Sequence, residues 1–303
     1  MTRVVVLGDV MVDVVARLSG PLAAASDAPA VIRFHGGGSA ANAAAWLAAA
    51  GAKPVLVGCV GDDEHGRHAR EELRVGGVDA RLAVDPELPT GTCVVLVGAD
   101  GERTMVPDAG ANDALREEDL ADDLLEPGGH LHVAGYALLR EGSRAAARAS
   151  VRRALRVGMS VSVDPSSSAL LSAEFLDWAA GAGLLLPNAQ EAEALTGEAD
   201  PERAARDLAA RFDEVVVTLG AGGALWTDGA DVLRVPAEPV EAVTDSTGAG
   251  DAFAAGLLSA RLSGAPVGEA LTAGCRLAAR AVTQAGARPN DGHRGGSPQR
   301  RSD

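Results

Sequence analysis

The segment from Asp245 to Asp251 reads Asp-Ser-Thr-Gly-Ala-Gly-Asp and stands at the start of a predicted helix. Its glycines allow several backbone N–H groups to turn toward one point, and the helix adds the positive end of its dipole, so the loop can bind an anion. The carboxylate of Asp251 would repel a phosphate that was only bound there, but it can take the proton of a hydroxyl group that attacks phosphorus. The segment therefore predicts phosphoryl transfer. The alternative is a plain turn in which the aspartate caps the helix.

Two better-known glycine loops do not fit this segment. In the dinucleotide-binding pattern G-x-G-x-x-G, the third glycine would fall at Phe253. The phosphate-binding P-loop requires a lysine, and the single lysine of the chain is Lys53, which stands next to Pro54 and far from the segment. The predicted chemistry therefore depends on the backbone amides and on Asp251.

A second glycine cluster, Gly36 to Gly38, opens another predicted helix and places Asn42 in its first turn. An amide side chain can both donate and accept hydrogen bonds, and Asp13 supplies an acceptor shortly after the first predicted strand. Together these groups could clamp neighbouring hydroxyl groups of a small sugar. The alternative is an ordinary helix start with Ser39 as the N-cap.

Two further candidates follow predicted strands, at the end where ligands bind in open α/β sheets. Asn188 and Glu191 lie one helical turn apart, and Glu191 could hold the water shell of Mg²⁺. The alternative there is a helix start with an acid that favours the dipole. The turn from Thr218 to Gly223 could cradle nucleotide phosphates or ribose, or it could simply lead into the next strand.

The elements that must position these residues alternate between short apolar runs and helical patterns. The apolar run at 2–8 ends at a glycine, as in a parallel strand that is covered on both faces. Helices are predicted at 39–50, 65–75, 249–262 and 267–284, and strands at 54–58, 131–134, 161–163, 184–186 and 215–219. This alternation predicts an α/β fold. His130 and His132 share one face of a predicted strand, where we expect them to pack in the core.

Two stretches, 11–35 and 92–107, lack a covering helix. Within the second, 93–97 and 103–106 are rich in β-formers and flank the turn Ala99-Asp100-Gly101, which predicts a hairpin. We expect both stretches to form a small antiparallel sheet that projects from the main body as a lid. Arg103 in this hairpin could contact an acidic or phosphorylated substrate, but a solvated turn residue is the favoured interpretation.

Length and composition bound the remaining possibilities. We expect one domain over 1–288 and a disordered tail at 289–303, which is rich in Gly, Arg, Ser and Pro. The chain carries 27 basic and 42 acidic residues, a formal net charge of −15, which disfavours nucleic acid as a partner. Cys59, Cys93 and Cys275 show no metal-binding or disulfide spacing. No apolar run is long enough for a membrane span, and we expect a cytoplasmic protein.

In this order and spacing, the four segments resemble those of the ribokinase-like (PfkB-type) carbohydrate kinases, over about 4–287. The stretch from Gly36 to Gly66 is similar to the N-terminal signature of that family, and Asp245 to Asp251 is similar to its C-terminal signature. The resemblance implies a three-layer α/β/α fold with a mostly parallel central sheet and a small β-sheet lid. It also implies ATP-dependent phosphorylation of a hydroxyl group on a sugar such as ribose, fructose or 2-keto-3-deoxygluconate. Relatives often form homodimers through the lid.

The resemblance also assigns roles to individual residues. Asp251 would be the general base, and the amides of Gly248, Ala249 and Gly250 would form the anion hole. The sugar would be bound by Asp13, Gly37, Gly38 and Asn42. The ATP site would include Asn188, Thr218, Gly220, Gly222 and Thr247, flanked by the helix near 278–285. Glu191 would lie at the Mg²⁺ site, and some relatives bind a monovalent cation such as K⁺ near the equivalent of Asp245.

Two observations leave the acceptor open. Many relatives carry D-x-N after the central strand, whereas this chain has Asp164-Pro165-Ser166. A nucleoside of the adenosine type is an alternative acceptor, although only 3% of the chain is aromatic and Phe34 and Tyr136 are the candidates for stacking near the site. A catalytically silent sugar- or nucleotide-binding regulator is the other alternative, and the intact Gly-Ala-Gly-Asp sequence disfavours it.

Overall fold

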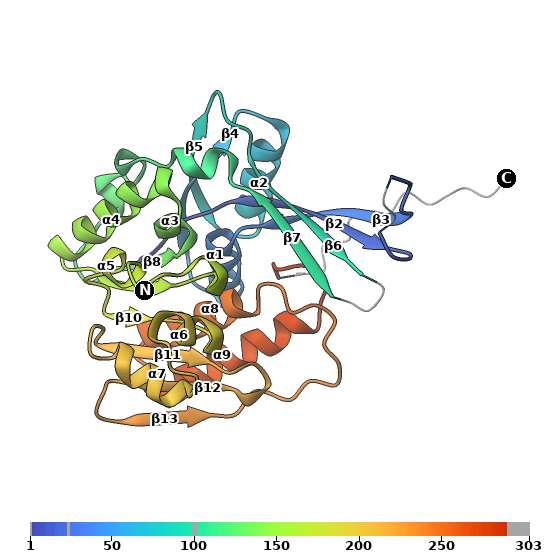
Figure 1. Ribbon diagram of the computed structural model, residues 1–303. Coiled ribbons are helices and arrows are strands. Elements are labelled where there is room, and N and C mark those ends of the chain that lie inside the picture. The colour runs from blue at the N-terminus through green and yellow to red at the C-terminus, as the bar shows by residue number, and fades with distance from the viewer. Residues whose placement is uncertain (1, 23–24, 99–101, 290–303) are drawn as a thin grey trace.

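The computed structural model describes residues 2–22, 25–98 and 102–289 (Figure 1). Its main body contains a nine-stranded sheet in the order β13-β12-β11-β10-β9-β8-β1-β4-β5. The strands from β5 to β11 are parallel neighbours, and β12 and β13 continue the sheet antiparallel. The strand bounds are β1 Val4–Leu7, β4 Pro54–Gly61, β5 Asp79–Asp85, β8 His130–Ala134, β9 Ser160–Asp164, β10 Leu184–Leu185, β11 Glu214–Thr218, β12 Ala224–Thr227 and β13 Val232–Val235.

Helices cover both faces of this sheet. One face packs against α4 (Glu141–Arg156), α5 (Phe175–Trp178), α6 (Ala189–Thr196) and α7 (Pro201–Leu208), with the short α3 (Tyr136–Leu139) beside them. The other face packs against α1 (Ser39–Ala49), α2 (Glu64–Val75), α8 (Ala249–Leu262) and α9 (Val267–Val282). Short 3₁₀ turns span Gly110–Ala114, Glu117–Asp119, Asp122–Leu124, Ser168–Leu170 and Gly220–Gly222.

The burial of alternate strand residues explains the two hydrophobic layers. In β1, Val5 and Leu7 join the cluster under α4 to α7, whereas Val4 and Val6 join the cluster under α1, α2 and α8. Because successive side chains of a strand point to opposite faces, a strand that is apolar throughout must be covered twice. The three-layer α/β/α fold with its mostly parallel sheet is therefore confirmed.

A second sheet, the lid, projects from the main body (Figure 1). It contains β2 (Met11–Leu18), β3 (Ala30–Gly37), β6 (Gly91–Val97) and β7 (Arg103–Asp108) in the order β3-β2-β6-β7. The small separate sheet is confirmed, but the expectation that it is antiparallel is wrong for its centre, where β2 and β6 are parallel. Strand β2 follows β1 and strand β6 follows β5. Because β1 and β5 run in the same direction in the main sheet, both lid strands leave from its carboxyl end and run in one direction. The turn predicted at 99–101 lies outside the described residues.

The elements that were predicted differ from the observed ones mainly at their ends, but α4, α7, β5 and β13 were not predicted. Strand β5 carries no strong sequence signal because it is an edge strand in which only Leu82 is buried. The tail expected at 289–303 lies outside the described residues except for Pro289. No helix of the described residues is both long and apolar enough to cross a membrane.

Candidate active site

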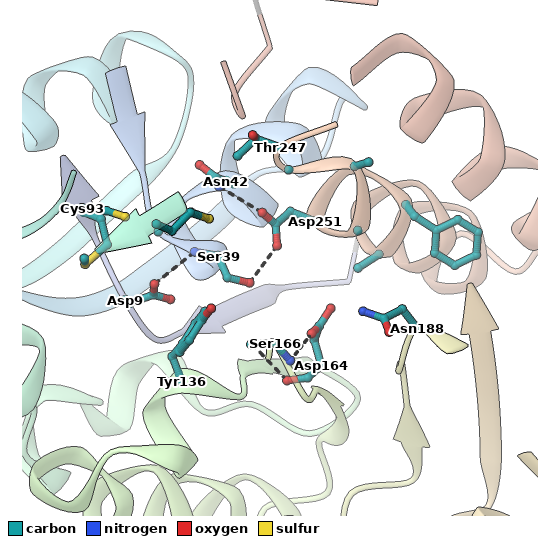
Figure 2. A pocket seen from close by; sticks show the side chains of 18 of the residues that line it. Asp9, Ser39, Asn42, Cys93, Tyr136, Asp164, Ser166, Asn188, Thr247 and Asp251 are labelled. Atoms are coloured by element: carbon teal, nitrogen blue, oxygen red, sulfur yellow. Dashed lines mark hydrogen bonds between the residues drawn. The ribbon is translucent and has the colours of Figure 1, made fainter. Parts of the chain in front are cut away.

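A cavity of about 370 Å³ lies between the lid and the carboxyl ends of the main-sheet strands. Its wall combines residues that follow β1, β8, β9 and β10 with the starts of α1 and α8. Figure 2 shows Asp251 facing Ser39 and Asn42, with Tyr136 and Asp164 across the cavity. The polar side chains of its wall include Asp9, Asp13, Ser39, Asn42, Tyr136, Arg140, Asp164, Ser166, Asn188, Glu191, Thr218, Ser246, Thr247 and Asp251.

The predicted anion-binding loop, 245–251, leads into α8 through a turn that requires glycine. Gly248 is the N-cap of α8 with φ of 76°, and a Cβ atom there would lie 2.5 Å from the carbonyl oxygen of Ala287, so only glycine fits. The first backbone bond of the helix runs from Ala252 N to Gly248 O at 2.9 Å. The amides of Gly250 and Asp251 consequently have no partner within the helix, whereas Ala249 N donates to Ser246 O at 3.3 Å, and all three residues line the cavity.

Asp251 is held by two side-chain donors from the start of α1. Its Oδ1 accepts a hydrogen bond from Ser39 Oγ at 2.7 Å, and its Oδ2 accepts one from Asn42 Nδ2 at 2.9 Å (Figure 2). Burial and the charge of Asp164 raise the pKa of Asp251 to about 7, although these two hydrogen bonds act in the opposite direction. A carboxylate with a pKa near neutrality is well matched to general-base catalysis.

The start of α1 differs from the alternative interpretation, in which Ser39 is the N-cap. Gly38 is the N-cap, and the carboxylate of Asp9 accepts hydrogen bonds from Ser39 N at 3.2 Å and from Ala40 N at 3.3 Å. The Ser39 hydroxyl is thereby available for Asp251. Asp9 is a site residue that sequence reasoning missed, although its place directly after β1 is a usable signal.

Further carboxylates crowd the same cavity. Burial and the charge of Glu191 raise the pKa of Asp164 to about 8, and burial is also the main cause that raises the pKa of Glu191 to about 7. Burial raises the pKa of Asp13 to about 6. The cavity therefore holds more buried carboxylates than cations, a donor set of hard oxygens that favours a divalent cation such as Mg²⁺.

Asn188 and Glu191 form a capping box at the start of α6. Asn188 Oδ1 accepts from Glu191 N at 2.9 Å, and Glu191 Oε2 accepts from Asn188 N at 2.8 Å. The helix-start alternative and the site interpretation are thus compatible, since both side chains also line the cavity. No group of three His, Cys, Asp or Glu side chains among the described residues could hold a metal by itself. Mg²⁺ does not need one, because it keeps several waters and binds substrate phosphates.

A second cavity, of about 590 Å³, continues from the first along α9. Its wall is mostly apolar and is made by the turn after β11, the segment at 237–243 and the α9 residues Cys275, Ala278, Ala279 and Val282. The two cavities share Thr218, Ser246, Ala249, Gly250 and Phe253. The amide-rich loop is therefore their common wall.

The structure brings most of the predicted residues to these two cavities. The first is lined by Asp13, Gly38, Asn42, Asn188, Glu191, Thr218 and the loop from Thr247 to Asp251, and the second by Thr218, Gly220, Ala249 and Gly250. Gly37 and Gly222 line neither. Gly37 lies behind Asp13, whose Oδ1 is 2.3 Å from the place where a Cβ of Gly37 would be. Phe34 is 64% exposed on the outer face of the lid and is not near the site.

Arg103 is not a solvated turn residue. From lid strand β7 its Nη1 reaches Asp245 Oδ1 at 2.5 Å and also donates to the hydroxyl of Thr247. Asp245 accepts further bonds from Thr247 N at 2.8 Å and from Gly286 N at 3.1 Å. Burial alone would raise the pKa of Asp245, but the hydrogen bonds from Thr247, Arg103 and Gly286 lower it. Arg103, Thr247 and Gly286 thus compete with any monovalent cation for the oxygens of Asp245.

Two cavities of similar or larger size lie elsewhere. One of about 1170 Å³ opens at the amino ends of the strands, near Lys53, and contains none of the predicted site residues. The other, of about 590 Å³, lies between the 3₁₀ turns and α4. Volume alone therefore does not identify the site, because ligands of such sheets bind at the carboxyl ends of the strands.

Comparison with known proteins agrees with this geometry. A family model described as pfkB family carbohydrate kinase matches residues 1–292. The chain is 34% identical over 281 residues to an ATP-dependent ribose-1-phosphate kinase of Halopiger xanaduensis, covering 89% of this chain and 88% of that protein. The structure of adenosine kinase from Sinorhizobium meliloti is similar with a TM-score of 0.86 and 30% identity, covering 95% of this chain and 96% of the other. Ribokinase from Thermotoga maritima is similar with a TM-score of 0.80 and 26% identity, covering 95% of each chain.

Proposed function

The chain belongs to the pfkB family of carbohydrate kinases and is a phosphotransferase, and we propose that it transfers the γ-phosphoryl group of ATP to a hydroxyl group of a small sugar, with Asp251 as the general base. One observation carries the proposal. The loop that bears Asp251 is the common wall of a polar cavity, suited to a polyhydroxyl acceptor, and an apolar cavity, suited to a nucleobase. A phosphoryl group at this wall is within reach of both ligands.

In the proposed reaction, Asp251 takes the proton of the acceptor hydroxyl while that oxygen bonds to the γ-phosphorus in line. The bond from phosphorus to the bridging oxygen breaks, and ADP leaves with the electron pair. The backbone amides of Ala249 and Gly250 stabilise the negative charge on the transferred group. The lid excludes water, which would otherwise accept the same group.

Among the cofactors, ATP occupies the apolar cavity in this proposal, with Thr218 and Gly220 beside its phosphates or ribose. Mg²⁺ would be held through water by Glu191, since the crowded carboxylates of the polar cavity fit a divalent cation, and it would supply charge neutralisation on the phosphates. K⁺ is not part of the proposal, because the partners of Asp245 do not leave it a free carboxylate.

The acceptor class has one rival. Tyr136 lines the polar cavity, and a similar structure is that of an adenosine kinase, so a nucleoside is the second candidate. The cavity's other aromatic side chain, Phe253, belongs to the wall shared with the apolar cavity. One stacking partner favours a nucleobase less than the many carboxylate and amide groups favour hydroxyl groups.

Asp251→Asn tests the role of the base, because it keeps the shape of the side chain and removes its proton acceptor. We expect kcat to fall by at least about 10²-fold with little change in KM. Asp207→Asn, on the exposed face of α7, is the matched control and should leave kcat unchanged. Near-native turnover of the Asp251 variant would show that another group takes the proton.

A coupled assay of ADP release over ribose, fructose, 2-keto-3-deoxygluconate and adenosine separates the acceptor classes. Turnover with a sugar alone supports the proposal, and turnover with adenosine alone replaces it with the nucleoside. Sugar binding without ADP release from any acceptor indicates a silent regulator.

The lid also suggests how two copies could pair. Its outer face exposes Ile32, Phe34 and Val106, which are 57%, 64% and 55% exposed. We propose that a second copy of this chain covers this face, because burial of these exposed apolar side chains would stabilise a dimer. Sedimentation of the wild type and of Phe34→Asp tests this; the variant should be monomeric where the wild type is a dimer.

A further inference from the structure

The segment from Gly286 to Arg288, which comes three residues after the end of α9, connects several parts of the site. Gly286 N donates to Asp245, and Ala287 O accepts from Trp46 Nε1 at 2.8 Å, while the same carbonyl packs against Gly248. Arg288 comes next and is only 8% exposed. A buried arginine needs specific partners, because the removal of a guanidinium from water is costly. The reaction described above makes no use of it.

The guanidinium of Arg288 lies directly behind the acceptor-binding residues. Its Nη2 donates to Gly37 O at 2.8 Å, its Nε donates to Asn42 Oδ1 at 3.4 Å, and its Nη1 lies 3.1 Å from Glu72 Oε2 of α2. A Cβ atom at Gly36 would lie 2.1 Å from Nη1, so the glycine cluster leaves room for the guanidinium. The charge of Arg288 also opposes the effect of burial on the pKa of Asp13.

The contact with Asn42 determines which way its amide group faces. An asparagine offers an acceptor oxygen on one side and a donor NH₂ on the other. Because Arg288 can only donate, it selects the oxygen of Asn42 and turns the NH₂ toward Asp251 Oδ2. In the reverse orientation, the carbonyl oxygen of Asn42 would face the carboxylate and repel it.

We propose that Arg288 is a positioning residue, which fixes the Asn42 amide toward the Asp251 carboxylate and holds Gly37 and Asp13 in place for the acceptor. Its planar fork donates to Gly37 O and Asn42 Oδ1 from separate nitrogens and places Nη1 beside Glu72, whereas the three donors of a lysine all radiate from one nitrogen. This proposal deepens the proposed function and rests on it for its kinetic consequences.

Arg288→Lys keeps the positive charge and removes the planar guanidinium group. It therefore separates the positioning of Asn42 from the effect of the charge. We expect kcat to fall and the KM for the acceptor to rise, with a combined loss of roughly ten- to hundredfold in kcat/KM, while the KM for ATP is unchanged. The acid limb of the pH profile should move to higher pH, because Asp251 loses the Asn42 bond that lowers its pKa. If the lysine variant does not fold, Arg288→Met with Glu72→Gln removes the ion pair as a whole and serves instead.

Trp46→Phe is the control for a merely structural role. It removes the hydrogen bond from Trp46 Nε1 to Ala287 O, a bond that anchors the segment from Gly286 to Arg288. The guanidinium group of Arg288 itself is unchanged. We expect a lower Tm with wild-type acceptor KM and pH profile. The proposal is overturned if the Arg288 variants keep wild-type kinetics, or if Trp46→Phe reproduces their changes in full.

A crystal structure of Arg288→Lys without substrate gives a readout that does not depend on turnover. An Asn42 amide turned away from Asp251 supports the proposal, and an amide that keeps its 2.9 Å bond to Asp251 overturns it. The absence of phosphoryl transfer by the wild type to every acceptor would instead count against the proposed function alone.

Discussion

At the scale of single residues, the carboxylate of Asp251 experiences two opposing influences. Burial and the charge of Asp164 favour its protonated form, whereas the hydrogen bonds from Ser39 and Asn42 favour its charged form. The balance places its pKa at about 7, so this carboxylate, the proposed base, is only partly deprotonated at neutral pH. Activity should therefore increase with pH through this region.

Ser39→Ala tests this balance. The Ser39 hydroxyl is 2.7 Å from Asp251 Oδ1, and a hydrogen bond to a charged group contributes about 1.5–3 kcal/mol. Its loss should raise the pKa of Asp251 and shift the acid limb of the kcat/KM profile by about one to two units to higher pH. At high pH, where the base is fully charged, the variant should approach wild-type activity. A variant that is equally impaired at every pH would show that Ser39 acts through contact with substrate instead.

The residues that sequence reasoning found and missed differ in a physical way. Asp251 and its loop form a local motif, whose chemistry follows from neighbours in sequence. Arg288 stands in a glycine-rich segment after the last helix, and its partners Gly37 and Asn42 lie about 250 residues earlier, with separations of 251 and 246. No local pattern encodes such a contact. Phe34 shows the opposite error, because it was predicted to lie near the site. It is close in sequence to the glycine cluster, but its side chain lies on the outer face of the lid.

At the scale of elements, the lid is joined to the anion-binding loop through Arg103. The ion pair between Arg103 of β7 and Asp245 is partly buried, with side chains 23% and 18% exposed. Asp245 in turn accepts from Thr247 N, which belongs to the loop. Docking of the lid and the arrangement of the loop are thus coupled through one carboxylate.

Arg103→Ala should weaken this docking and admit water to the site. We expect less sugar phosphate per ADP released, because water then competes as the acceptor. Both products should be measured in the same reaction. Arg17→Ala is the matched control, since Arg17 pairs with Val97 and Val97 with Arg103 in one row of the lid sheet. The control should keep the wild-type ratio of products.

The wild-type protein also tests whether a monovalent cation activates the reaction. Because the guanidinium of Arg103 already neutralises Asp245, the wild type should have equal rates in potassium chloride and tetramethylammonium chloride at one ionic strength. Strong activation by K⁺ would contradict the arrangement seen around Asp245.

At the scale of the whole molecule, the layers were predictable and the lid's pairing was not. Apolar runs that alternate with helical patterns are sufficient to predict a parallel sheet covered on both faces, because the residues of each strand show by themselves that both of its faces are buried. The parallel pairing of β2 with β6 joins segments about 80 residues apart, and either direction would satisfy their apolar pattern. Direction is set by where the chain leaves the main sheet, which depends on the complete fold.

The buried titratable groups of the whole molecule form two sets with opposite effects on stability. In the site, burial raises the pKa values of Asp164, Glu191 and Asp251 to about 8, 7 and 7. In the core, burial lowers the pKa values of His130 and His132 to about 3 and 4. Both imidazoles remain neutral there and share hydrogen bonds with the hydroxyl groups of β9 at 2.8 Å.

The sign of each contribution follows from which state binds more protons. For the site carboxylates the folded state binds protons more tightly, so their stabilising contribution is complete below the unfolded pKa near 4 and is lost as pH rises through about 7 to 8. For the histidines the unfolded state binds protons more tightly, so stability falls as pH falls from 6.5 toward 4. Above pH 6.5 only the first set acts, whereas below it the two sets oppose each other.

We therefore expect the Tm of the ligand-free protein to fall between pH 6.5 and 8.5, by roughly 2–4 °C for each kcal/mol lost. Glu191→Gln removes one titrating group and its repulsion of Asp164, so it should flatten the alkaline side. Glu193→Gln, on the exposed face of the same helix, should not. A wild-type Tm that rises from pH 6.5 to 8.5 would mean that these carboxylates are already ionised and compensated in the folded protein. Their crowding could then not be the reason why the base titrates near neutral pH.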